Sequence, residues 1–278
     1  MLKLNLINPS KSNIQFSISR FPDGEVQISL GEFDRKNNIT IICRISSAED
    51  LFIVAQACDI LKRNGVMYGL EITYLMSMRM DRVMDFNRPF SLKIVSDIIK
   101  GFGAEWIDIL EAHSARTHFE LCSNPTDNPV YSIIHEIQTE YVKGLSRVLV
   151  YPDAGAKSRY DLNSKFPIVT FCKKRDLETG KIISIEPEDN KDCLLEADEV
   201  YIFDDLCDAG GTFVGIANYI RGINKNCKLN ILVTHMVNPK GISNLSNNFD
   251  HVWFTNSYKD WKEELGTLPI NVTQIDVV

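Results

Sequence analysis

The stretch EVYIFDDLCDAGGTFVGIANYIRGIN, residues 199–224, contains the features that decide the fold. It begins with large apolar residues in a continuous run, as expected for a strand buried on both faces of a parallel sheet. Two aspartates end that run. A turn of small residues, 208–212, then leads into apolar residues spaced as on one face of a helix. Strand, turn and helix in this order predict an α/β fold.

The same alternation of strands and helices recurs along the chain. Further strands are expected at 39–43, 70–76, 106–110, 147–151, 167–172, 229–235 and 251–255, and further helices at 48–65 and 91–103. The pattern runs twice, and the polar stretch CSNPTDNP at 122–129 is the best candidate for a boundary. We therefore expect two α/β domains, 1–130 and 131–278, each with a mainly parallel sheet and with ligand sites beyond the carboxyl ends of its strands.

Composition narrows the class of protein. The chain has 278 residues, 44% hydrophobic and 24% charged, which is ordinary for a soluble globular protein. A net charge of -7 argues against a nucleic-acid partner, because such proteins usually carry a basic excess. The seven cysteines are widely spaced and form no C-x-x-C pair, and no apolar run is long enough for a membrane span. With no signal-peptide pattern at the N-terminus, we expect a cytoplasmic protein without a membrane partner.

Residues 204–212 are the first candidate for a site. The strand delivers Asp204 and Asp205 to the end of a sheet, and the small residues that follow would let the backbone approach a ligand closely. Amide groups at the start of a helix suit a phosphate, and the carboxylates could accept hydrogen bonds from sugar hydroxyls. The alternative is that Asp208 only caps the helix and the glycines only form a turn. The spacing alone leaves both interpretations open.

Six segments of the chain, in order, resemble ribose-phosphate pyrophosphokinases, which have the type I phosphoribosyltransferase fold. They are RFPDGEVQISL (20–30), MRMDRVMDFNRPFSLKIVSDII (78–99), ILEAHSARTHFELCSNPTDNPVYS (109–132), VYPDAGAKSRY (150–160), FCKKRD (171–176) and YIFDDLCDAGGTF (201–213). The resemblance implies that both domains are phosphoribosyltransferase-like. The N-terminal one would bind ATP and the C-terminal one a ribose phosphate.

The activity implied by the resemblance is transfer of the β,γ-diphosphoryl group of ATP to the anomeric hydroxyl of ribose 5-phosphate, which releases AMP. Such chemistry depends on positioning and on neutralising the charge of the phosphoryl oxygens, and it therefore uses Mg²⁺ and fixed cations. By resemblance, the catalytic cations are Lys173 and Arg175, and the metal residues are His113 and Asp153. Since Mg²⁺ prefers oxygen ligands, we expect part of the role of His113 to run through water.

The resemblance also assigns the two substrate-binding sets. The ATP set comprises Phe21, Asp23, Glu25, Arg79 and Asp127, with Phe21 as a flat apolar face for adenine and Arg79 on the phosphates. The ribose-phosphate set comprises Asp204, Asp205, Asp208, Ala209, Gly210, Gly211 and Thr212. In the family, the FPDGE loop reaches a neighbouring subunit, so the resemblance implies a homo-oligomer, a dimer or a hexamer.

The sequence departs from the family at several points. Met80 stands where the family usually has glutamine, Ala156 where it has glycine, and Ala209 where it has a threonine hydroxyl. The family's N-terminal G-N-x-x-P segment and its C-terminal helix have no counterpart in the sequence. That C-terminal region contributes to the family's allosteric phosphate/ADP site, so the resemblance does not imply that regulation here.

The change at Ala209 bears on the identity of the acceptor. A phosphate monoester dianion needs more donors than a diester with one charge, so we hypothesise ribose 5-phosphate or a larger ribosyl 5-phosphate such as ADP-ribose. Two other functions stay open. One is a phosphoribosyltransferase that consumes phosphoribosyl pyrophosphate, supported by the shared 204–212 loop. The other is a non-catalytic regulatory partner of an active synthetase, against which the presence of Lys173, Arg175, His113 and Asp153 argues.

Overall fold

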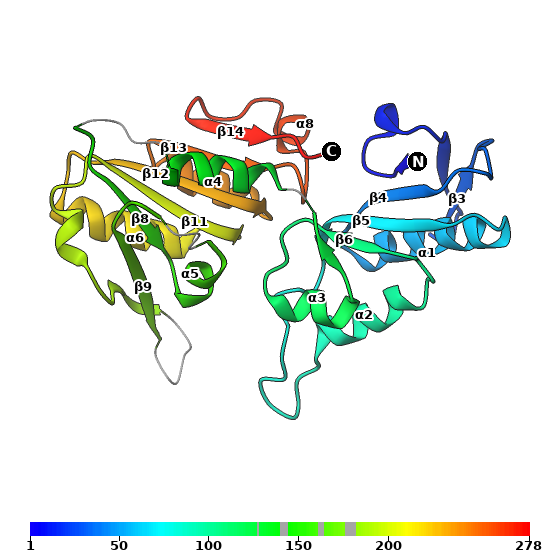
Figure 1. The fold of residues 1–278 in the computed structure, drawn as a ribbon, viewed down its shortest axis with the longest axis horizontal. Coiled ribbons are helices and arrows are strands. Elements are labelled where there is room, and N and C mark those ends of the chain that lie inside the picture. The colour runs from blue at the N-terminus through cyan, green and yellow to red at the C-terminus, as the bar shows by residue number, and fades with distance from the viewer. Residues whose placement is uncertain (127, 140–143, 161–163, 176–181) are drawn as a thin grey trace. The chain divides into compact units, whose positions relative to one another are not determined.

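The computed structural model describes residues 1–126, 128–139, 144–160, 164–175 and 182–278, with only the backbone described at 138–139, 174–175 and 182–183. Contacts divide the chain into two compact units. Unit 1 comprises Met1–Asp127 with Val278, and unit 2 comprises Asn128–Val277. Each unit is an α/β structure, and the ribbon shows the helices lying against the faces of a sheet in each of them (Figure 1).

Unit 1 is built on a five-stranded parallel sheet with strand order β1-β4-β5-β6-β7, together with a separate antiparallel hairpin of β2 and β3. Its elements are β1 (Leu2–Asn5), a 3-10 turn (Pro9–Lys11), β2 (Phe16–Arg20), β3 (Val26–Leu30), β4 (Ile39–Ile45), α1 (Ala48–Arg63), β5 (Tyr68–Leu75), α2 (Ser91–Lys100), β6 (Ile107–Ile109), α3 (Ala115–Leu121) and β7 (Asn124–Pro125).

Helix α1 begins and ends where its sequence directs. Ser47 accepts a hydrogen bond from the backbone N–H of Asp50, and the Asp50 carboxylate accepts from the Ser47 backbone in return, which is a capping box. Basic Lys62 and Arg63 occupy the last turn, where the negative end of the helix dipole favours them. The apolar face of α1 packs with β4 and β5 in the core of unit 1.

Unit 2 is built on a seven-stranded sheet with strand order β10-β9-β8-β11-β12-β13-β14, in which β10 is antiparallel to β9 and the other described pairs are parallel. Its elements are α4 (Pro129–Thr139), β8 (Arg147–Tyr151), α5 (Ala154–Tyr160), β9 (Ile168–Arg175), β10 (Ile182–Pro187), a 3-10 turn (Lys191–Leu194), β11 (Glu199–Cys207), α6 (Gly211–Ile223), β12 (Lys228–Met236), α7 (Pro239–Ser246), β13 (His251–Thr255), α8 (Trp261–Leu265) and β14 (Val272–Ile275).

The sheet of unit 2 is buried on both faces, which accounts for the continuous apolar runs in its strands. In β8, Val148 and Val150 pack into one apolar cluster with residues of α6 and α7. Leu149 and Tyr151, on the opposite face, pack into a second cluster with residues of α4 and α5. Successive side chains of a strand point to opposite faces, so burial on both sides requires apolar residues at every position.

The strands and helices expected from the sequence are all present, with one difference that matters for the site. The strand predicted at 199–203 continues to Cys207 as β11. Asp204 and Asp205 therefore belong to the strand itself, whereas the apolar run alone suggested that they follow it. The extension pairs with β12 through Asp204, Leu206 and Cys207.

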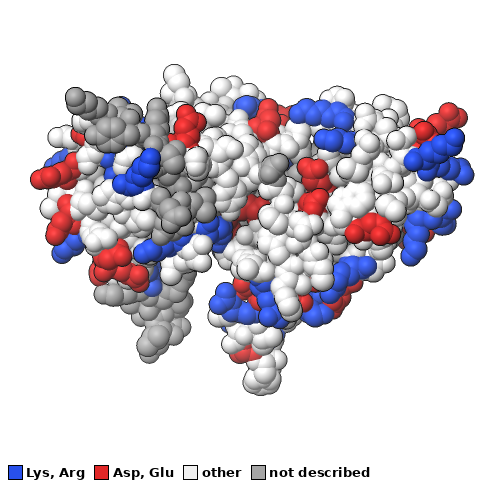
Figure 2. Space-filling view, in the orientation of Figure 1, with Lys and Arg blue, Asp and Glu red and all other residues white. Residues whose placement is uncertain are grey.

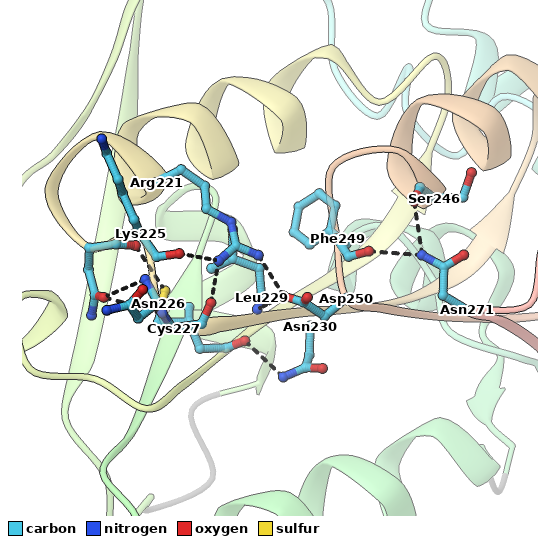
Figure 3. Close-up of polar contacts among 12 residues, drawn as sticks. Arg221, Lys225, Asn226, Cys227, Leu229, Asn230, Ser246, Phe249, Asp250 and Asn271 are labelled. Carbon is cyan, nitrogen blue, oxygen red and sulfur yellow. Dashed lines mark hydrogen bonds and ion pairs between the residues drawn. The ribbon is translucent and has the colours of Figure 1, made fainter.

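A network of hydrogen bonds links the connections at the amino ends of β12 and β13 (Figure 3). Arg221 at the end of α6 forms an ion pair with Asp250, with 2.6 Å between Nη2 and Oδ2, and the same carboxylate oxygen accepts from the Leu229 backbone N–H at 2.7 Å. Asn271 donates to the carbonyls of Ser246 and Phe249. These bonds join the connections at this end of the sheet, opposite to the carboxyl ends discussed below.

Among the described residues, no helix is long and apolar enough to cross a membrane. Basic and acidic side chains are interspersed on the face of the molecule shown in Figure 2.

Candidate active site

The carboxyl ends of three neighbouring strands in unit 2 carry most of the predicted residues. Strands β9, β8 and β11 are adjacent and parallel, so their carboxyl ends lie at one edge of the sheet. Lys173 lies near the end of β9, Asp153 follows β8, and Asp204 and Asp205 lie in the last part of β11. Lys173 Nζ is 3.3 Å from Asp153 Oδ2, so the structure brings a predicted catalytic cation and a predicted metal residue into contact.

Asp153 is positioned by helix α5. Its Oδ1 accepts a hydrogen bond from the Ala156 backbone N–H at 3.0 Å, which fixes the carboxylate at the start of that helix. The side chain stays 48% exposed, so its oxygens are accessible to a ligand as well as to Lys173. Ala156, which stands where the family has glycine, is fully buried in the apolar cluster beneath α5. Its methyl group therefore packs into the core and does not line the site.

Asp204 and Asp205 share one arginine. Nη1 of Arg159, at the end of α5, lies 2.8 Å from Oδ1 of Asp205 and 3.4 Å from Oδ1 of Asp204. Asp204 Oδ1 also accepts from the Asp205 backbone N–H at 2.9 Å. Burial and the neighbouring Asp205 carboxylate raise the pKa of Asp204 well above its ordinary value, and Arg159 opposes that rise.

Arg159 was not among the residues predicted from the sequence. It lies in the segment VYPDAGAKSRY that carried the resemblance, and a signal was available there. The strand order of an α/β sheet places a short helix after β8 next to the end of β11, and an arginine on that helix is the natural partner for two adjacent carboxylates.

The loop 208–212 joins β11 to α6. Gly210 occupies the left-handed region with φ of 79° and precedes the first residue of the helix, a conformation that favours glycine. Asp208, Ala209 and Gly211 are exposed, and Thr212 is half-buried. The first N–H groups of a helix have no acceptor within it, so the start of α6 presents donors at the same edge as the carboxylates.

Three predicted nucleotide residues of unit 1 lie at the tip of the β2–β3 hairpin. Phe21, Asp23 and Glu25 form its turn, in which the Phe21 N–H donates to the Glu25 carbonyl at 2.8 Å and the Glu25 N–H to Asp23 Oδ1 at 3.2 Å. All three are exposed, and the Phe21 side chain is 50% exposed. The ion pair of Arg20 with Glu49 at 2.6 Å connects the hairpin to the first turn of α1.

Arg79 and His113 lie in the connections that follow two adjacent strands of unit 1, β5 and β6. Arg79 is exposed and His113 is half-buried. The buried Asp81 joins the two connections, because its Oδ2 accepts from the Ser114 hydroxyl at 2.7 Å and its Oδ1 from Arg82 Nε at 2.8 Å. Hydrogen bonding from Arg82 is the main cause that lowers the pKa of Asp81. Asp81 was not predicted from the sequence.

The side chains of two predicted residues, Asp127 and Arg175, are not described. Asp127 lies outside the described residues, and only the backbone of Arg175 is described, in β9. The predicted metal residues are in different units, His113 in unit 1 and Asp153 in unit 2. Within the described parts of the chain, no group of three His, Cys, Asp or Glu side chains gathers to hold a metal ion.

Curated proteins with one shared name are similar to the chain over most of its length. The chain is 26% identical over 272 residues to a ribose-phosphate pyrophosphokinase of Aquifex aeolicus, covering 91% of this chain and 82% of that protein. It is 25% identical over 258 residues to ribose-phosphate pyrophosphokinase 3 of Saccharomyces cerevisiae, covering 86% and 76%. No family model matches the chain.

Among solved structures, the fold is similar to that of phosphoribosylpyrophosphate synthetase from Mycobacterium smegmatis. The TM-score is 0.79 at 19% sequence identity, over 97% of this chain and 88% of that one. The fold is thus that of two phosphoribosyltransferase-like domains. Curated proteins named ribose-phosphate pyrophosphokinase are thus similar to the chain over most of its length.

Proposed function

We propose that the protein transfers the β,γ-diphosphoryl group of ATP to the anomeric hydroxyl of a ribosyl 5-phosphate, with release of AMP. The observation that carries this proposal is the edge of unit 2. There, Lys173 contacts Asp153 at 3.3 Å, and Arg159 contacts Asp204 at 3.4 Å and Asp205 at 2.8 Å. The loop 208–212 begins at the same edge. Relatives named ribose-phosphate pyrophosphokinase supply the reaction type.

In this reaction the anomeric oxygen of the acceptor attacks the β-phosphorus of ATP. The bond from that phosphorus to the oxygen bridging the α- and β-phosphates breaks, AMP leaves with that oxygen, and the acceptor hydroxyl loses its proton. Lys173 would neutralise charge on the transferring group, and Arg175 would act beside it. Asp204 and Asp205 would accept hydrogen bonds from the ribose hydroxyls, and the loop amides would bind the 5-phosphate.

We assign nucleotide binding to unit 1. The exposed ring of Phe21 offers a flat face to adenine, with Asp23 and Glu25 beside it in the same turn. Arg79, which is exposed after β5, would bind the phosphates with its forked donors. Asp127 is assigned to the same function through the resemblance alone.

Magnesium fits the residues that would hold it. Mg²⁺ is usually bound by one or two carboxylates together with substrate phosphates and waters, and not by an all-protein cage. The half-exposed Asp153 of unit 2 would supply such a carboxylate. His113 of unit 1 is assigned to metal binding, in part through water, by the resemblance alone. The ion would neutralise the phosphate oxygens when it is bound with ATP.

The acceptor is proposed to be ribose 5-phosphate or a larger ribosyl 5-phosphate such as ADP-ribose. Ala209 is exposed in the loop and brings no hydroxyl donor to the phosphate. A phosphodiester-like 5-phosphate carries less charge than a monoester dianion and requires fewer donors. We further propose that the protein acts in the cytoplasm and forms at least a homodimer. Light scattering of the purified protein tests the oligomeric state.

The test is incubation with ATP, Mg²⁺ and each acceptor in turn, followed by mass spectrometry. The proposal predicts AMP together with an acceptor heavier by one diphosphoryl group. AMP without a diphosphorylated acceptor would contradict it. If phosphoribosyl pyrophosphate were instead consumed with a base and without ATP, the protein would be a phosphoribosyltransferase.

A further inference from the structure

We propose that helix α7 fixes the conformation of the loop 208–212, with Asn238 and Asn244 as positioning residues that set the affinity for the acceptor phosphate. This inference rests on the proposed function of the loop. Neither asparagine lies in one of the six segments quoted for the resemblance, and the sequence alone did not predict a role for either.

Asn238 holds the first residue of the loop. Its Nδ2 donates to Asp208 Oδ1 at 2.9 Å, and its Oδ1 accepts from the Lys240 backbone N–H at 3.0 Å. The second bond caps α7 and fixes the amide so that its NH₂ group faces Asp208. The direction of the Asp208 side chain is therefore tied to the start of α7.

Asn244 holds the next peptide group. Its Nδ2 donates to the carbonyl oxygen of Ala209 at 2.8 Å. A trans peptide is planar, and its C=O and N–H point in opposite directions. Since the Ala209 carbonyl is directed to α7, the N–H of Gly210 in the same peptide is directed away from α7. By holding the Ala209 carbonyl, Asn244 leaves the N–H of Gly210 available to donate to an anion. It also keeps the Ala209 carbonyl oxygen from facing that anion.

The close packing of α7 on the loop depends on Gly241. A Cβ atom at this position would lie 2.2 Å from the Asp208 carbonyl oxygen and 2.9 Å from Met236 Sδ, which are impossible approaches. On the next turn, Leu245 contacts Gly210 so closely that a Cβ there would lie 3.3 Å from Cδ2 of the leucine. The helix therefore supports the loop at Asp208, Ala209 and Gly210.

This support matters more here because of Ala209. Because position 209 brings no hydroxyl, the loop relies more on its backbone N–H groups to bind the phosphate, and the orientation of each peptide group then has a larger effect on the affinity. Removing the Asn244 donor would let the 209–210 peptide rotate and lose one N–H bond to the anion.

The experiment compares Asn244→Ala, Asn244→Asp and Asn238→Ala with the matched control Asn248→Ala. Asn248 lies just beyond α7 and also donates its amide to a backbone carbonyl, that of Asn244, but it makes no contact with the loop among the described bonds. Titration calorimetry measures binding of inorganic phosphate, ribose 5-phosphate and ATP to each protein, and thermal unfolding checks that each variant is folded.

We expect the Asn244 variants to weaken binding of phosphate and ribose 5-phosphate by about tenfold, as for the loss of one hydrogen bond to an anion. The affinity of the Asn244 variants for ATP should be unchanged. The affinities of Asn248→Ala for phosphate and ribose 5-phosphate should also equal those of wild type. Equal phosphate affinity in all four variants and wild type would overturn the inference, as would a wild-type protein that binds no phosphate. A wild type that binds ribose 5-phosphate but forms no diphosphorylated product would refute the proposed reaction alone, because the binding comparison does not depend on turnover.

Discussion

Arg159 Nη1 lies 2.8 Å from Asp205 Oδ1, and this contact joins the short helix after β8 to the end of β11. The Arg159 side chain is 14% exposed and that of Asp205 only 2% exposed. The guanidinium also lies over the Tyr160 ring at 5.4 Å from its centre. A charge pair so deeply buried is costly to break, because removing one partner leaves the other charge without compensation.

We therefore expect Arg159→Ala to lower the free energy of unfolding by about 3–5 kcal/mol. Chemical denaturation measures this loss. Arg159→Lys should restore only part of it, because an ammonium group cannot reproduce the fork of a guanidinium. The control is Arg63→Ala, whose ion pair with Asp59 is exposed and worth about 0.3–0.5 kcal/mol. Equal losses for the two alanine variants would contradict a supporting role of Arg159.

Stability should depend on pH through Asp204. Its pKa in the folded protein is raised, so the unfolded chain loses this proton first as the pH rises through about 4. Between that value and the raised folded pKa, ionisation therefore removes stability from the wild type. Asp204→Asn cannot ionise, and its unfolding free energy relative to wild type should improve as the pH rises from 3 to 7. A difference that stays constant over this range would argue against a raised pKa.

Through Asp81, stability should change with pH in the opposite direction. Hydrogen bonding from Arg82 and Ser114 lowers its pKa, so the folded state gains stability above the ordinary pKa of aspartate and loses it as the pH falls through the lowered value. Asp81→Asn should therefore be destabilised relative to wild type more strongly at pH 7 than at pH 3. The same denaturation series measures both variants, and slopes of equal sign would contradict the two assignments together.

Lys173 should be required for turnover. We expect Lys173→Ala to reduce kcat about 100-fold or more, as for other fixed groups that stabilise transition-state charge. Release of AMP measures this. Lys225→Ala is the control, because this lysine is exposed beside the network at the opposite end of the sheet. Equal AMP release by wild type and Lys173→Ala would remove Lys173 from the mechanism, and no release by wild type would favour a non-catalytic partner.

Phe21 should contribute to nucleotide binding. Stacking of a base on an aromatic ring is worth about 1–3 kcal/mol, so Phe21→Ala should raise the KM for ATP about tenfold and leave that for the acceptor unchanged. Ile18→Ala, at a 44% exposed position of the same hairpin, serves as the control. A rise in the acceptor KM instead of the ATP KM would refute the assignment of Phe21 to adenine.

Much of the fold could be predicted because its signals are local. Continuous apolar runs such as 147–151 predict strands buried on two faces, and the structure shows Val148 and Leu149 in different apolar clusters. The sequence FPDGE is that of an ordinary β-turn. Only the resemblance to ribose-phosphate pyrophosphokinases assigned a function to it. Strand β10, which is antiparallel to β9, had no clear signal in the polar sequence around it.

The site was harder to predict because several of its residues act through partners distant in sequence. Arg159 and Asp205 are 46 residues apart, and only the pairing of β8 with β11 brings them together. Asn244 lies 35 residues from Ala209, and an asparagine at the end of a helix usually suggests a cap. Ala156 stands where the family has glycine, and only the structure shows that its methyl group packs in the core.

The central claim is transfer of a diphosphoryl group from ATP to the anomeric oxygen of a ribosyl 5-phosphate. The most direct measurement uses ATP labelled in the β-phosphate, with Mg²⁺ and either ribose 5-phosphate or ADP-ribose, and follows the label by mass spectrometry. The proposal predicts unlabelled AMP and a labelled, diphosphorylated acceptor in equal amounts, both formed at least about 100-fold more slowly in Lys173→Ala. Formation of labelled ADP, or the failure of both acceptors to gain the label, would contradict it.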